Sequence, residues 1–121
     1  MRYMLLVCHD EQAWGKVSET EQQRALDQSV QLCHEINSSG NYLAAAPLHP
    51  TSTATSVRVR DGKPLVTDGP YAETREQLAG YFLINAKDRD EAIGIAARVP
   101  GARIGTVEVR PVKEVAGLPN E

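Results

Sequence analysis

The chain has 121 residues, which fits one folded domain that can close a core without disulfides or a metal. Its content of 41% hydrophobic and 24% charged residues is ordinary for a globular protein. A formal net charge of −3, without a block of Lys or Arg, argues against a nucleic-acid partner. We expect one domain over residues 1–115 and a loose tail over residues 116–121. We also expect no membrane span and a cytoplasmic location, because the N-terminal apolar run is short.

The first half of the chain predicts a strand, a long helix and a second strand. Residues 2–9 form a dense apolar run typical of a strand, and residues 18–21 form a capping box that begins the helix. Gly40 is expected to end this helix in a left-handed conformation, and a short strand follows at 42–46. Pro47 and Pro50 then end the strand, because proline has no N–H to donate. The helix is predicted to bury one stripe of side chains at intervals of three or four, namely Leu26, Val30, Cys33 and Ile36.

The second half predicts a hairpin, a strand, a shorter helix and a last strand. Val57 and Val59 alternate with polar residues over 55–60, and Asp61-Gly62 is the dipeptide preferred in a type I′ turn before the return at 64–67. A strongly apolar strand is expected at 79–85, and an alternating strand at 104–112. Between them, a helix capped from Asp88 is predicted to bury Ala92, Ile93, Ala96 and Val99 on one face.

This order indicates an α+β fold, a ferredoxin-like βαββαβ arrangement with an inserted β-hairpin. A doubly wound sheet would need more helices. The two strands that are central in such a fold, 2–9 and 79–85, are apolar on both faces, whereas two helices cover only one face. We therefore expect a homodimer in which the sheets pair face to face. The alternative is that the inserted hairpin folds over the open face.

The chain resembles the DGPF family of YCII-related proteins in several segments. These are Asp68-Gly69-Pro70-Tyr71, Ala72 to Leu78, Gly80-Tyr81-Phe82, the stretch from Leu48-His49-Pro50 to Val57-Arg58, and Val107 to Pro111. The resemblance implies a dimeric α+β barrel. Narrower YCII proteins carry a His on the first helix and an Asp before the Pro that ends the second, where this chain has Ser29 and Val99. The acid–base chemistry of that pair is therefore not expected here.

The candidate catalytic residues lie around the signature loop at 67–83. A histidine within hydrogen-bond reach of a carboxylate makes a general base with an orienting partner, and His49, Asp68 and Glu73 could converge in this way. Each also has a structural alternative. Asp68 could hydrogen-bond its own turn, Glu73 could cap a turn or pair with Arg75, and His49 could be a packing residue.

A second set of side chains indicates a binding pocket. Arg75 offers a forked donor for a carboxylate, Tyr71 gives an apolar wall with a polar tip, and His9 ends the first strand nearby. Such a pocket would hold an organic anion or a hydroxylated ring. No metal-ligand spacing involves the three His or the two Cys, and no cofactor motif is present, so we expect neither a metal nor a cofactor.

Three functions remain open at this point. The first is binding of a small organic molecule by a homodimer, with Tyr71 and Arg75 as anchors. The second is a cofactor-independent lyase or isomerase with His49 or Asp68 as the base. The third is a regulatory interaction module, because domains of the family that this chain resembles are often associated with sigma factors.

Overall fold

The computed structural model describes residues 1–119, and residues 120–121, the end of the predicted tail, lie outside the described residues. Its first half contains β1 (Arg2–His9), α1 (Glu11–Gly15), α2 (Glu19–Ser38), β2 (Tyr42–Pro47) and the 3₁₀ turn η1 (Thr51–Thr53). Its second half contains β3 (Thr55–Arg60), β4 (Lys63–Asp68), β5 (Gln77–Asn85), α3 (Arg89–Ala96), the 3₁₀ turn η2 (Pro100–Arg103) and β6 (Thr106–Pro111).

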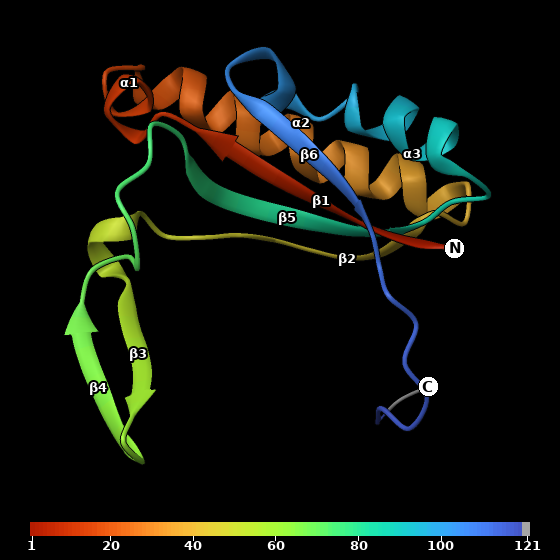
Figure 1. The fold of residues 1–121 in the computed structure, drawn as a ribbon. Helices are drawn as coiled ribbons and strands as arrows, with labels where there is room; N and C mark the ends of the chain where they lie inside the picture. Colours follow the sequence, from red (N-terminus) through yellow and green to blue (C-terminus); the bar gives the residue numbers. More distant parts are fainter. Residues whose placement is uncertain (120–121) are drawn as a thin grey trace.

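The main sheet is antiparallel, with the strand order β2-β5-β1-β6. The two apolar strands β1 and β5 are therefore central, as the sequence predicted for a ferredoxin-like fold. Both long helices lie on the same side of this sheet (Figure 1). The opposite face of the sheet is not covered by a helix, which leaves one layer of helices on one layer of strands.

The core lies between the sheet and the helices. Side chains alternate along β1, so that Tyr3, Leu5 and Val7 are buried, while Met4 and Leu6 on the other face are only half-buried. In the register of the sheet, Leu5 lies opposite both Phe82 of β5 and Val109 of β6. The largest fully buried side chains of the core are Leu5, Ile36, Ile84 and Val99. Burying each contributes roughly 1.5–3 kcal/mol.

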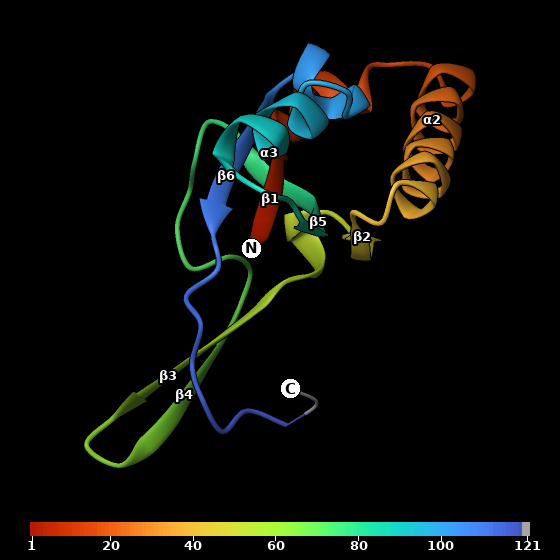
Figure 2. The same cartoon turned by 90° about the vertical axis from the view of Figure 1, so that its right-hand side faces the viewer.

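The helix α2 buries only part of the predicted stripe. Ile36 is fully buried and Cys33 is half-buried, but Leu26 and Val30 are 44% and 50% exposed. That part of the prediction is wrong, and Leu32, which it omitted, is buried instead. Figure 2 shows α2 standing beside the sheet. Its C-terminal half provides all of its buried residues, so the N-terminal half is not packed onto the core.

The helix α3 also departs from the expected face. Ala92, Ala96 and Val99 are buried as predicted, but Ile93 is exposed and Ile95 is buried in its place. The positions 92, 95, 96 and 99 follow the spacing i, i+3, i+4, i+7 of one helix face, whereas position 93 turns away from it. A correct reading of the period would have chosen Ile95.

The inserted hairpin β3–β4 forms a separate two-stranded sheet. Its turn has positive φ at both Asp61 (52°) and Gly62 (74°), which is the conformation of the predicted type I′ turn. The hairpin extends away from the four-stranded sheet on the side opposite the helices, instead of lying flat across the open face (Figure 1, Figure 2).

Candidate functional site

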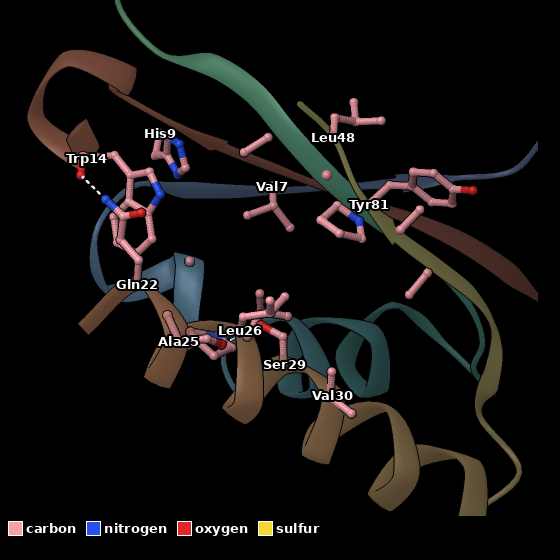
Figure 3. Close-up of a pocket in the computed structure, with 18 of the residues that line it drawn as sticks. Val7, His9, Trp14, Gln22, Ala25, Leu26, Ser29, Val30, Leu48 and Tyr81 are labelled. Atoms are coloured by element: carbon pink, nitrogen blue, oxygen red, sulfur yellow. Dashed lines mark hydrogen bonds between the residues drawn. The ribbon is translucent and has the colours of Figure 1, made fainter. Parts of the chain in front are cut away.

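A cleft of about 1260 Å³ lies between α2 and the sheet. Its volume exceeds the ~300–1,000 Å³ typical of small-molecule pockets, because one side is open. Leu26, Ser29 and Val30 of α2 face Val7 of β1 across this space (Figure 3). The exposed apolar residues of α2 thus form one wall of the cleft. Most of the remaining lining is also apolar, including Ala25, Ala45, Leu48, Phe82 and Ile104.

The polar end of the cleft is built where β1 leaves the sheet. His9 follows Val7 by two residues and so projects to the helix side of β1. Its ring stacks on Trp14, with the ring centroids 5.3 Å apart and the planes at 29°. Asp10 brings Trp14 into place by capping α1, since its carboxylate accepts from the backbone N–H groups of Gln12 (2.9 Å) and Ala13 (3.3 Å).

One side chain ties this polar end to α2. The Nε2 of Gln22 donates to the carbonyl oxygens of Trp14 and Val17, both at 3.0 Å (Figure 3 draws the first). These bonds hold the beginning of α2 against α1. Ser29 of α2 donates its hydroxyl to the carbonyl oxygen of Ala25 at 3.0 Å. It therefore has an intrahelical partner although it lines the cleft.

Burial lowers the pKa of His9, although the nearby carboxylates of Glu11, Glu76 and Asp10 act in the opposite direction. The desolvation of the ring is the larger cause, because a charged imidazolium loses more solvation than a neutral ring does. The lowered pKa favours the neutral form of His9 at neutral pH. A neutral imidazole can donate a hydrogen bond from one ring nitrogen and accept one at the other.

The ionisable side chains that line the cleft are histidines and carboxylates. All three histidines of the chain line it, together with the carboxylates of Glu11 and Glu19. Among the described residues that form its walls, there is no Lys or Arg. The cleft therefore offers hydrogen-bonding groups and negative charge, but no permanent positive charge to pair with an anion.

The signature loop lines a second, more polar pocket of about 540 Å³, which adjoins the cleft at Glu11 and Gln12. The carboxylate of Glu11 accepts from the N–H (2.9 Å) and the hydroxyl (2.8 Å) of Thr51, and its own N–H donates to Oε1 of Gln77 (2.9 Å). Glu11 therefore joins the end of β1 to η1 and to the start of β5. Glu73 and Arg75 lie in this second pocket.

The structure does not bring the six predicted site residues together. His9 and His49 line the cleft, and Glu73 and Arg75 line the second pocket. Asp68 and Tyr71 line neither of them. Asp68 ends β4 opposite Thr55, and Tyr71 is 79% exposed. Sequence reasoning missed Trp14, Gln22 and the role of Leu26, although the Asp10 cap before Trp14 was a readable signal for α1.

Other reactive groups show no sign of a redox or metal centre in the described part of the chain. Burial raises the pKa of the Cys8 and Cys33 thiols, which lie in β1 and α2 respectively. Within residues 1–119, no group of three or more His, Cys, Asp or Glu side chains is arranged to hold a metal ion. No helix among these residues is both long and apolar enough to cross a membrane.

The fold and the cleft together define a ferredoxin-like α+β domain with a pocket between its first long helix and its sheet. The sequence model of the YCII-related domain matches residues 1–116, so the chain belongs to the YCII-related family. It is also 34% identical over 114 residues to an uncharacterized protein of Rhizobium meliloti (strain 1021). That match covers 93% of this chain and 92% of the relative.

Proposed function

We propose that the protein binds a small, mostly apolar organic molecule in the cleft between α2 and the sheet. The observation that carries the proposal is the exposure of Leu26 and Val30, which face Val7 across an open space instead of packing into the core. Because each is about half-exposed, it forgoes part of the roughly 1.5–3 kcal/mol that full burial of such a side chain contributes. An apolar ligand would recover part of this free energy, while His9 and Trp14 provide hydrogen bonds at the end of the cleft.

The polar group of the ligand is a hydroxyl or a similar uncharged group. A buried carboxylate needs a positive partner, and no Lys or Arg lines the cleft within the described residues. Glu11 and Glu19 would repel it as well. The neutral ring of His9 and the indole N–H of Trp14 suit a hydroxyl, which both donates and accepts. Of the two ligand types considered from the sequence, this lining favours the hydroxylated ring over the organic anion.

The functional unit in this proposal is a homodimer. Met4 and Leu6 of β1 lie beside Tyr81 and Leu83 of β5 on the open face of the sheet, in the middle of the four strands. A second copy that packs its sheet on this face would remove these side chains from water. Native mass spectrometry of the purified protein tests this part, and a monomer would refute it.

Trp14 gives a direct assay for the ligand class, since it is the single tryptophan of the chain and lines the cleft. We would titrate the protein with 4-tert-butylphenol, 4-tert-butylbenzoate and 4-tert-butylbenzylammonium, which share an apolar body and carry a neutral, a negative and a positive polar group, respectively. Tryptophan emission, excited at 295 nm, should report saturable binding of the phenol and much weaker binding of the benzoate. Equal or tighter binding of the benzoate would contradict the assignment of the polar group.

A matched pair of variants locates the site. Leu26→Asp, in the wall of the cleft, should abolish the response to the phenol. Ile93→Asp, at a similarly exposed position of α3 outside the cleft lining, should not change it. If Leu26→Asp bound the phenol as the parent does, the cleft would not be the binding site, and a protein partner would become the better explanation of the family's regulatory associations.

A second candidate function is favoured by the lowered pKa of His9. A neutral imidazole beside an apolar ligand is a competent general base, so a cofactor-independent lyase or isomerase is the enzymatic alternative. In its first step, His9 would remove a proton from carbon next to a carbonyl, leaving an enolate. The test is proton–deuteron exchange of 2-indanone in D₂O, followed by NMR. Exchange that is accelerated by the parent and lost in His9→Gln would support catalysis, and equal rates would oppose it.

A further inference from the structure

The β3–β4 hairpin carries an apolar face that nothing in the described chain covers. In its register, Val57 lies opposite Val66, and Val59 lies opposite Pro64, which places these four side chains on one face. The three valines are 63%, 66% and 61% exposed. The other face carries Arg58, Arg60 and Lys63, with Leu65 opposite Arg58. The hairpin is therefore amphipathic, although its apolar face lies in solvent.

The hairpin is fixed at its base and unsupported at its tip. The N–H of Gly69 donates to the carbonyl oxygen of Ala54 at 2.7 Å, and the hydroxyl of Ser56 donates to the carbonyl oxygen of Gly69 at 2.7 Å. Beyond these bonds, every residue from 57 to 68 is exposed. A two-stranded hairpin without a packing partner is only marginally stable in water. A defined hairpin of this kind thus requires a surface on which its apolar face packs.

The direction of the hairpin indicates where that surface lies. The hairpin leaves the molecule on the side of the sheet that faces away from the helices (Figure 1, Figure 2), and this is the side of Met4, Leu6 and Leu83. Strands of six residues are about 20 Å long, whereas packed sheets lie about 10 Å apart. A second copy seated on the open face therefore lies within the span of the hairpin.

We propose that the hairpin is an arm that packs Val57, Val59 and Val66 against a second copy of the chain. The inference rests on the homodimer of the proposed function and adds a second contact region to its sheet-to-sheet contact. Two-fold symmetry makes the contact reciprocal, so that each copy gives one arm and receives one.

A crosslinking experiment tests the arm directly. The photoreactive residue p-benzoylphenylalanine replaces Val59 in one sample and Arg58, on the opposite face, in the matched control. Each protein is mixed with ¹⁵N-labelled parent, allowed to exchange subunits, irradiated and examined by mass spectrometry. We expect crosslinks between labelled and unlabelled chains to be at least fivefold more abundant from position 59 than from position 58.

The outcomes separate the two ideas. A dimer in native mass spectrometry, with crosslinks confined within one chain, would overturn the arm and leave the homodimer intact. A monomer would overturn both. A pair of substitutions gives an independent measurement: Val66→Asp should raise the dimer Kd by roughly tenfold or more, while Thr67→Asp, on the other face of the same strand, should change it much less. Equal effects of the two substitutions would overturn the arm.

Discussion

The imidazole ring of His9 stacks on the indole ring of Trp14 at a centroid distance of 5.3 Å. The stack joins the last residue of β1 to α1, the short helix that Asp10 caps, and it closes one end of the cleft. Because Trp14 is the single tryptophan of the chain, its fluorescence reports on the charge of His9 and on the contents of the cleft at once.

The protonation of His9 should be visible in Trp14. An imidazolium ring in contact with an indole quenches its emission, so fluorescence should fall as the pH decreases. The midpoint should lie below about 6.5, the ordinary histidine value, because burial lowers the pKa of His9. The transition should disappear in His9→Gln and persist in His34→Gln. A transition that survives in His9→Gln would show that another group causes the quenching.

The same shift makes folding stability depend on pH. Between the pKa of His9 in the folded protein and about 6.5, the unfolded chain binds more protons than the folded protein. The free energy of unfolding should therefore decrease as the pH falls through this window. Above the window, His9 is neutral in both states and does not affect the free energy of unfolding. Urea unfolding at several pH values measures this slope. His9→Gln should flatten it, and an unchanged slope would assign it to other groups.

The two halves of α2 should respond differently to truncation. Ile36→Ala removes a fully buried side chain and should cost about 2–5 kcal/mol in free energy of unfolding. Leu26→Ala should change it by no more than about 1 kcal/mol, since Leu26 faces the cleft and is nearly half-exposed. Urea denaturation of both variants checks the difference. A large loss for Leu26→Ala would mean that α2 closes onto the sheet in solution.

The hydrogen bonds of Glu11, which lies between the two pockets, should stabilise the fold. Glu11→Ala removes both acceptors of Thr51 and should destabilise the fold by about 1–3 kcal/mol. Glu73→Ala is the control, because Glu73 is exposed and makes no hydrogen bond or ion pair within residues 1–119. Thermal unfolding compares the two variants. Similar melting temperatures for both would show that the Glu11–Thr51 bonds contribute little.

Gly80 tests the close packing between β2 and β5, and Gly94 of α3 provides a contrasting control. A Cβ at Gly80 would lie 2.8 Å from the carbonyl oxygen of Ala46, so Gly80→Ala should cost about 1–3 kcal/mol by forcing the strands apart. A Cβ at Gly94, within α3, would meet nothing within 4 Å. Gly94→Ala should stabilise the protein by about 0.5–1 kcal/mol, because alanine favours the helix. Chemical denaturation of both variants should give opposite signs.

Much of the fold could be predicted from local sequence because the relevant signals are short-range. Ser18 caps α2 by accepting from the N–H of Glu21 at 3.2 Å, as the capping box predicted, although Glu21 itself pairs with Arg24 at 3.0 Å. The Asp61-Gly62 turn has the backbone that its dipeptide favours. The apolar character of β1 and β5 on both faces identified them as the central strands.

Which residues line the cleft could not be predicted from the sequence, because it depends on how far apart whole elements lie in the folded protein. A helical stripe predicts that Leu26 and Val30 share a face, but not whether that face meets the sheet or an open cleft. The sequence also allowed His49, Asp68 and Glu73 to converge at one end of the sheet, whereas His49 lines the cleft, Glu73 lines the second pocket and Asp68 lines neither. The reason is physical: periodicity determines which side chains point together, and only the packing of whole elements decides what lies opposite them.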